Sequence, residues 1–164
     1  MAPSLDSIAI VLPLGVAVTM TFSTVIIQAL ALMPIIYFVR YELRRGRAGV
    51  RFWKDVGIIA GATLVALAAH VVAIATWALV FRFCGEFPQL AGAVYHSAMN
   101  YTTLGDSDMV MSLSWRLLAP LEAANGMLMF GVSTALLYAV IQRLIQTRLS
   151  ESGGYGTRTQ STRE

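Results

Sequence analysis

The polar stretch Tyr101-Thr102-Thr103-Leu104-Gly105-Asp106-Ser107-Asp108 decides the fold of this chain. It lies between two long apolar stretches, each long enough to cross a lipid bilayer. Polar main chain at membrane depth is tolerated only where it is buried in protein or lines a water-filled path. We therefore predict that this stretch is the part of a membrane protein that handles ions.

The composition indicates an integral membrane protein. Of the 164 residues, 57% are hydrophobic and 13% are charged, whereas a soluble domain carries about 25% charged residues. No charged residue occurs from Ser7 to Val39 or from Val56 to Phe81, and each stretch exceeds the roughly 20 residues that cross a bilayer. Cys84 is the only cysteine, which excludes an intrachain disulfide and a metal site built from several cysteines.

The basic residues predict the orientation of the chain in the membrane. Six of them crowd the short loop after the first apolar stretch: Arg40, Arg44, Arg45, Arg47, Arg51 and Lys54. Cytoplasmic loops carry an excess of Lys and Arg, so we expect this loop and the C-terminus in the cytoplasm and the N-terminus outside, with the bacterial inner membrane as the location. This uneven placement favours the lipid bilayer, rather than nucleic acid, as the partner of the basic residues.

The pattern of apolar and polar stretches predicts an all-α membrane protein with three transmembrane helices and one short re-entrant helix. The expected segments are a first transmembrane helix and basic loop over 1–54, a second spanning helix over 55–83, the re-entrant helix over 88–101, an extended polar segment over 102–108, a third spanning helix over 114–146 and a disordered cytoplasmic tail over 148–164. Residues 55–147 are expected to form one domain.

The extended polar segment has the residues that ion binding requires. A ring of backbone carbonyls can replace the hydration shell of an ion, and glycine allows the dihedral angles that aim successive carbonyls at one axis. Thr103, Leu104 and Gly105 fit this demand. The negative end of a re-entrant helix that ends near Asn100 would face a cation in the membrane. Because one such segment cannot enclose a path, several copies must surround a symmetry axis.

The residues from Ala93 to Asp108, A-V-Y-H-S-A-M-N-Y-T-T-L-G-D-S-D, resemble the pore helix and selectivity filter of tetrameric potassium channels, where an aromatic-rich helix runs into T-T-V-G-Y-G-D. The matching positions are Tyr95, Ser97, Thr102, Thr103, Gly105 and Asp108. The stretch Asn125-Gly126-Met127-Leu128-Met129-Phe130-Gly131 looks like the inner helix of two-helix potassium channels, which often carries two such glycines. The resemblance covers about Gly57 to Arg143 and leaves the first span outside.

The resemblance implies a homotetramer and a non-enzymatic function, the conduction of monovalent cations. The pore helix would be 88–101, the filter 102–108, and the outer and inner helices 55–83 and 114–146. The filter residues would be Thr102, Thr103, Leu104, Gly105, Asp106 and Ser107. The backbone carbonyls of Thr103, Leu104 and Gly105 would bind permeant K⁺ or Na⁺, with no other cofactor.

Two filter positions depart from the family pattern. Asp106 stands where the family has tyrosine, and Ser107 stands where it has the last glycine. The aspartate resembles the T-V-G-D-G filter of bacterial channels that pass both sodium and potassium. Loss of the tyrosine ring removes a support of the outer carbonyls, so we expect a wider outer filter and weak selectivity between potassium and sodium.

Acidic residues are expected at the outer mouth. Asp106 and Asp108 would each occur four times there, and a ring of carboxylates concentrates cations and can bind Ca²⁺ or Mg²⁺. Glu86 belongs to the same loop-rich segment. In the family, the acid after the filter often bonds to an aromatic residue of the pore helix, so Tyr95 or His96 is expected to contact Asp108 and support the filter from behind.

Four residues in the spans allow more than one interpretation. Gly126 and Gly131 can serve as a hinge of the inner helix or allow close helix packing. His70 is an intramembrane ionisable group and hence a candidate for function, although a hydrogen bond to a neighbouring carbonyl explains it more simply. Glu122 either pairs with a polar group between subunits or faces a water-filled cavity.

Two other classes of function compete with the channel. The first is a non-conducting membrane interaction protein, or a partner subunit, that retains the channel fold; Asp106 and Ser107 keep this alternative open. The second is a membrane enzyme, which needs a nucleophile with its base or a cluster of metal ligands. His70 and His96 are the only histidines, and neither accompanies a paired cysteine or acidic motif. The enzyme is therefore disfavoured.

Overall fold

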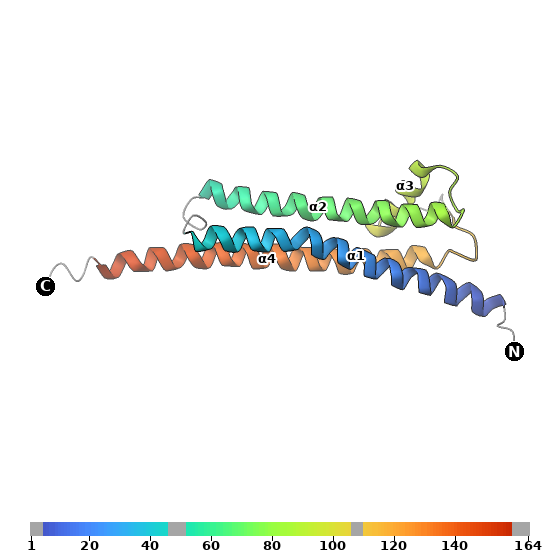
Figure 1. The fold of residues 1–164 in the computed structure, drawn as a ribbon, viewed down its shortest axis with the longest axis horizontal. Helices are drawn as coiled ribbons and strands as arrows, with labels where there is room; N and C mark the ends of the chain where they lie inside the picture. The colour runs from blue at the N-terminus through green and yellow to red at the C-terminus, as the bar shows by residue number, and fades with distance from the viewer. Residues whose placement is uncertain (1–4, 46–51, 106–109, 159–164) are drawn as a thin grey trace. The chain divides into compact units, whose positions relative to one another are not determined.

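The computed structural model describes residues 5–45, 52–105 and 110–158, and every regular element in these ranges is a helix (Figure 1). The helices are α1 (Leu5–Arg44), α2 (Phe52–Phe83), α3 (Leu90–Tyr101) and α4 (Leu118–Arg158). The all-helical prediction is confirmed, with three long helices and one short helix between the second and third of them.

Three helices are long and apolar enough to cross a membrane. The candidate spans are Ile10–Arg44, Phe52–Phe83 and Leu118–Leu149. Many large apolar side chains on these helices are not covered by the rest of the chain. Water-soluble proteins rarely expose a large contiguous apolar surface. The chain is a membrane protein, and these side chains suit contact with lipid or with other protein in the bilayer.

Some helix boundaries differ from those that the sequence predicts. α2 begins at Phe52 rather than at residue 55, and α4 begins at Leu118 rather than at 114 because a hydrogen-bonded turn over 112–117 precedes it. Pro88 and Gln89 stay outside α3, and Gln89 is extended (φ −114°, ψ 135°). The main difference is at the end of α4, which continues to Arg158 through a segment where the sequence predicts a disordered tail.

The chain divides into two compact units. Unit 1 comprises Met1–Ala29 and Ala68–Val132, and unit 2 comprises Leu30–Leu67 and Ser133–Glu164. The three long helices each contribute to both units. All of α3 belongs to unit 1, which also contains the polar stretch after it.

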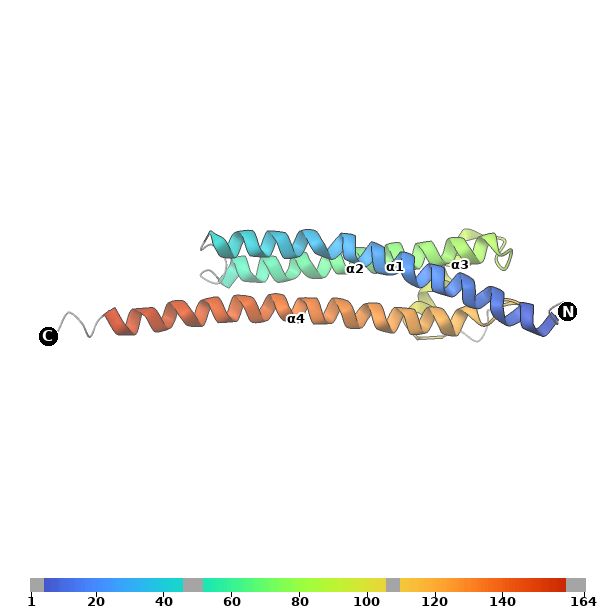
Figure 2. The same ribbon diagram turned by 60° about the horizontal axis from the view of Figure 1, so that its bottom comes forward.

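Unit 1 has an aromatic core around α3. Trp77, Phe81, Tyr101 and Leu118 are completely buried in it. Their contribution is large, because aromatic side chains bury the greatest apolar area of any residue. Both ribbon views show α3 beside the last part of α2 (Figures 1 and 2). The core therefore packs against one face of α3, a helix that is too short to be stable alone.

In the described part of unit 2, apolar packing and an ion pair join the helices. Val39, Val140 and Leu144 form a small buried cluster. The Arg148 guanidinium lies 2.7 Å from the carboxylate of Asp55, which is buried. This contact ties α4 to the start of α2 and helps to explain why α4 remains helical beyond residue 147.

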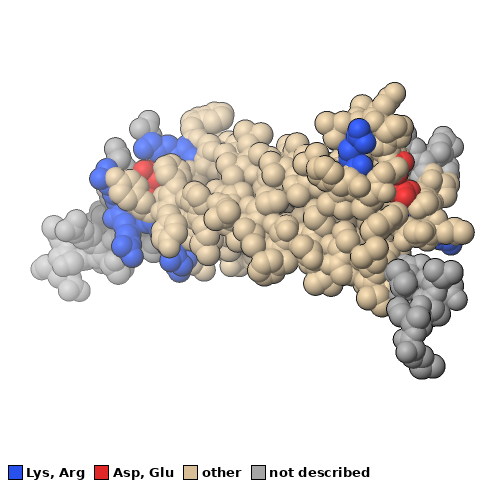
Figure 3. Space-filling view, turned by 45° about the vertical axis from the view of Figure 1, so that its right-hand side comes forward, with Lys and Arg blue, Asp and Glu red and all other residues tan. Residues whose placement is uncertain are grey.

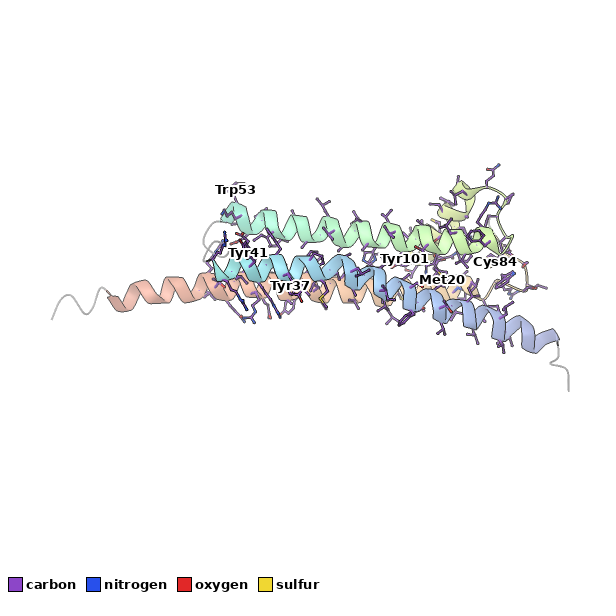
Figure 4. The ribbon with its side chains drawn as sticks, in the orientation of Figure 1. Met20, Tyr37, Tyr41, Trp53, Cys84 and Tyr101 are labelled. Carbon is purple, nitrogen blue, oxygen red and sulfur yellow. The ribbon has the colours of Figure 1, made fainter. Side chains whose placement is uncertain are left out.

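The end of α1 and the start of α2 carry the features of a membrane interface. Lys and Arg side chains gather at this end of unit 2 (Figure 3). Tyr37, Tyr41 and Trp53 lie in the same region (Figure 4) and are 68%, 48% and 81% exposed. Aromatic and basic residues concentrate where a membrane protein leaves the hydrocarbon, so unit 2 contains one such boundary.

Candidate functional site

The short helix α3 is fixed to two neighbouring helices by one serine. Ser97 Oγ lies 2.9 Å from the Ile74 carbonyl oxygen on α2 and 2.5 Å from Glu122 Oε1 on α4. Serine and threonine within a helix usually bond to a carbonyl of their own preceding turn, as Thr76 does to Val72 at 2.7 Å. Ser97 instead uses its hydroxyl for contacts between helices.

The last residue of α3 is also held on several sides. Tyr101 is completely buried, and its hydroxyl lies 3.2 Å from His70 Nδ1 on α2. The Phe130 ring on α4 lies 4.3 Å from the His70 ring and 5.6 Å from the Tyr101 ring, measured between centroids. The simpler interpretation of His70, a hydrogen-bonded structural histidine, is thus supported, although its partner is a phenol rather than a carbonyl.

The main chain at the end of α3 lies directly against α4. A Cβ added at Gly126 would overlap the Tyr101 carbonyl oxygen and lie 2.9 Å from its carbonyl carbon. At Gly131 an added Cβ would meet nothing within 4 Å. Close packing is therefore the role that the structure supports for Gly126, and the hinge remains a prediction for both glycines.

The residues after α3 turn back onto the end of that helix. Their N–H groups donate to carbonyls of its last turn: Thr102 to Ala98 at 3.1 Å, Thr103 to Asn100 at 2.8 Å and Gly105 to Met99 at 3.1 Å. The carbonyls that end a helix have no partner within it and need such donors. Over residues 102–105 this turn replaces the extended chain that the sequence predicts.

The turn contains two residues with positive φ. Gly105 has φ 68°, which glycine adopts easily, whereas Thr103 has φ 63°. For a β-branched residue this conformation is an outlier that costs on the order of 1–3 kcal/mol and is typical of functional sites. The four residues 102–105 are exposed, and Leu104 is 74% exposed. A strained, exposed turn thus follows the firmly anchored helix.

The predicted residues around the mouth have different environments. Asp106, Ser107 and Asp108 lie outside the described residues, so the contact of Asp108 with Tyr95 or His96 stays a prediction. Tyr95 is 49% exposed. His96 is buried, and its ring centroid lies 4.8 Å from that of Phe87 and 5.3 Å from that of Phe81. His96 therefore belongs to the aromatic core, while Tyr95 faces away from it.

Glu86 holds the stretch of chain that leads from the candidate filter to α4. Its carboxylate accepts hydrogen bonds from the Ser112 N–H at 2.7 Å and from the Ser112 hydroxyl at 2.6 Å. Ser112 begins the turn that leads into α4. Glu86 thus anchors the return of the chain toward α4, while a role for Glu86 at the outer mouth remains a prediction.

Three polar partners were not predicted from the sequence. Thr24 Oγ1 on α1 lies 3.1 Å from Asn125 Oδ1 on α4, and both residues are buried. Ser97, which the sequence indicates only as a match to the family pattern, contacts Glu122. Glu122 is buried within the chain itself, rather than at either place that the sequence suggests. Polar residues inside apolar spans often join helices, and this is the signal that identifies Thr24 and Asn125 as candidates.

Within the described ranges, no group of three or more His, Cys, Asp and Glu side chains could hold a metal ion. The exposed residues after α3 offer main-chain carbonyls and the hydroxyls of Thr102 and Thr103 as oxygen ligands. Hard cations prefer such oxygen ligands.

Comparison with known families gives one match. Residues 69–143 match the family model described as an ion channel. No curated protein and no solved structure matches the chain at a significant level. The matched segment includes all of α3, the turn after it, and Gly126 and Gly131 of α4, and it excludes α1. The resemblance of the pore segment to ion channels is thereby confirmed.

Proposed function

We propose that this chain, whose residues 69–143 form an ion-channel domain, is one subunit of a homotetrameric channel for monovalent cations. The observation that carries the proposal is the exposed, strained turn over 102–105 at the end of α3, whose residues Ala93, His96, Ser97 and Tyr101 are buried. This turn lies within the matched segment, and we assign it to the filter. The contacts of Ser97 and Tyr101 with α2 and α4 would hold its main-chain oxygens in place.

Four copies would complete the pathway. A single turn is open on one side and cannot surround an ion, so rotational symmetry must supply the other walls. The C-terminal end of α3 carries partial negative charge, which favours a cation at Thr103, Leu104 and Gly105.

Weak selectivity between potassium and sodium is the second part of the proposal. It rests on Asp106 and Ser107, which replace an aromatic residue and a glycine of the selective filter. Selectivity depends on the number and spacing of the coordinating carbonyls. A filter without the outer aromatic ring would order fewer of them.

The outer mouth would attract divalent cations. Asp106 and Asp108 are the candidate ligands, whereas the Glu86 carboxylate is occupied by Ser112. We expect external Ca²⁺ or Mg²⁺ to block the current. An effect of millimolar calcium on the wild type that disappears in Asp106→Asn would support this part, and an equal current with and without calcium in both proteins would contradict it.

The proposed orientation places the N-terminus outside and the C-terminus in the cytoplasm of a bacterial inner membrane. The support is the basic cluster of unit 2, which includes Arg40, Arg44 and Arg143. Basic residues of short loops stay on the cytoplasmic side. The turn over 102–105 would then lie toward the outer half of the membrane.

Cation flux into liposomes tests the central proposal. Purified wild-type protein should dissipate a potassium gradient across the liposome membrane. Gly105→Ala should abolish this potassium flux because alanine disfavours the positive φ. Gly57→Ala is the matched control, since Gly57 is helical and a Cβ there meets nothing within 4 Å. Flux that survives Gly105→Ala would contradict the filter assignment. A folded wild-type protein without flux would favour the non-conducting interaction protein.

Reversal potentials in sodium–potassium gradients test the selectivity. A weakly selective channel should reverse well short of the potassium equilibrium potential. A value close to that potential would refute weak selectivity while leaving the channel itself intact.

A further inference from the structure

Three oxygens from three helices form a continuous chain in the core of unit 1. Glu122 on α4 is completely buried, and its Oε1 lies 2.5 Å from Ser97 Oγ on α3. Ser97 Oγ in turn lies 2.9 Å from the carbonyl oxygen of Ile74 on α2. Both distances are in the range of O–H···O hydrogen bonds. The chain therefore needs two protons, one for each bond.

The number of available protons depends on the state of Glu122. The Ser97 hydroxyl has one proton to donate, and the Ile74 carbonyl can only accept. If Glu122 were ionised, it too could only accept, and two oxygens would compete for the single Ser97 proton. If Glu122 carries a proton, it donates to Ser97, and Ser97 donates to Ile74. Only the protonated acid gives both bonds a donor.

The surroundings of Glu122 also favour the neutral form. Among the residues described, no Lys, Arg or His nitrogen lies within ion-pair distance of its carboxyl, and Oε2 has no hydrogen-bond partner. An ionised carboxylate without a partner is very costly to bury, so such a group takes up a proton instead. The distance of 2.5 Å between Ser97 Oγ and Glu122 Oε1 does not by itself identify the protonation state, because charged acceptors also form bonds this short. The number of protons needed and the absence of a nearby cation among the described residues decide that Glu122 is neutral.

We propose that Glu122 is a neutral carboxylic acid that donates its proton to Ser97 and thereby positions α3 between α2 and α4. Ser97 lies one helical turn before Tyr101, and the candidate filter begins directly after Tyr101. The hydrogen bonds that link Glu122, Ser97 and Ile74 would fix the position of α3 along α2 and α4. They would thereby fix the position of the turn over 102–105. Glu122 touches no permeating ion in this arrangement and is a positioning residue.

Infrared difference spectroscopy tests the protonation state without reference to conduction. The C=O stretch of a protonated carboxylic acid is separate from the bands of a carboxylate. At neutral pH the wild type should show this band, and Glu122→Gln should lose it, while the other acidic residues cancel in the difference spectrum. A difference spectrum at neutral pH that contains carboxylate bands and no protonated band would overturn the proposal.

Ser97→Ala provides a second variant for the same spectrum. It removes the acceptor of the Glu122 proton, so the protonated band should remain and shift in frequency. A band that stays at the wild-type frequency would show that Glu122 does not donate to Ser97. This variant keeps the proposal testable if Glu122→Gln fails to fold.

The positioning role rests on the proposed channel and is tested by flux. Glu122→Gln should retain flux, because an amide N–H can donate to Ser97 in place of the acid. Ser97→Ala and Glu122→Val should each lower flux about tenfold, as expected when a buried hydrogen-bond partner is lost. Equal flux in all four proteins would overturn the positioning role and leave both the channel and the infrared result standing.

The pH dependence separates Glu122 from the other ionisable groups of this core, which are His70 on α2 and His96 and Tyr101 on α3. The α1 segment over 10–29 contributes no ionisable side chain. Flux of the wild type should fall at alkaline pH as Glu122 loses its proton, and Glu122→Gln should remove that fall. If the same alkaline fall persists in Glu122→Gln, another group causes it and the proposed role of the proton fails.

Discussion

Gly126 of α4 lies directly against the main-chain carbonyl of Tyr101, the last residue of α3. A Cβ at this position would be 3.2 Å from the Tyr101 Cα and still closer to the carbonyl group. The obstacle is main chain at the end of a helix, which cannot rotate away as a side chain would. The position of the candidate filter therefore depends on the absence of a side chain at residue 126.

Gly126→Ala should destabilise unit 1 and displace the end of α3. Inserting a methyl group into a packed interior typically costs about 1–3 kcal/mol, and here the carbonyl of Tyr101 has to move. We expect a lower unfolding temperature in detergent and a loss of cation flux in liposomes. Thermal unfolding monitored by tryptophan fluorescence, together with the flux assay, measures both effects.

Gly131→Ala is the matched control on the same helix. An added Cβ meets nothing within 4 Å there, and replacing glycine by alanine inside a helix adds up to about 1 kcal/mol of stability. The unfolding temperature should stay the same or rise. A loss of flux without a loss of stability in this variant would favour the hinge, and equal destabilisation of both variants would contradict the assigned contact at Gly126.

The hydrogen bond between Tyr101 and His70 can be measured by a double-mutant cycle. Tyr101→Phe removes the hydroxyl and keeps the ring against Phe130, so we expect a loss of about 1 kcal/mol in the free energy of unfolding. His70→Phe should also destabilise the protein. Because the two residues share one bond, the double variant should lose less than the sum of the single variants. Strict additivity would show that the bond contributes nothing.

The hydrogen bond between Thr24 and Asn125 joins α1 to α4 within unit 1. Thr24→Val keeps the shape of the side chain and removes the buried bond to α4, which should lower stability by about 1 kcal/mol. Thr19→Val is the control, because the Thr19 hydroxyl is exposed and bonds to the Gly15 carbonyl of its own helix at 2.9 Å. If the two variants unfold at the same temperature, α1 is only a peripheral helix.

The long helices could be predicted from the sequence because a charge-free stretch of membrane length has few alternatives. Their ends were less accurate, since helix continues past the apolar part where polar side chains find partners. Arg148 illustrates this: its ion pair with Asp55 joins residues that are far apart in the sequence. No local pattern around residue 148 indicates that contact.

The sequence predicts where along the chain the candidate site lies, but not the contacts that hold it in place. The polar residues Thr102 to Gly105 stand out between apolar spans, and the family pattern assigns them a role. The contacts that hold α3 are different, because Ser97 with Glu122 and His70 with Tyr101 pair residues of separate helices. Their spacing follows from helix packing rather than from any motif, so the sequence left the functions of His70 and Glu122 open.

Cys84 should react slowly with thiol reagents at neutral pH. Burial, and to a lesser extent the negative charge of Glu86, raise the pKa of its thiol above the ordinary value. The thiolate is the reactive form, so alkylation should be slower than that of a free cysteine and should accelerate as the pH rises toward the raised pKa.

Glu86→Gln removes the negative charge beside Cys84 and should speed the alkylation of Cys84. Ser112→Ala removes the hydrogen bond from the Ser112 hydroxyl but keeps the bond from its backbone N–H and the charge of Glu86. A similar acceleration in that variant would assign the slow reaction to access rather than to electrostatics. Mass spectrometry of maleimide-labelled protein over a series of pH values gives the rates.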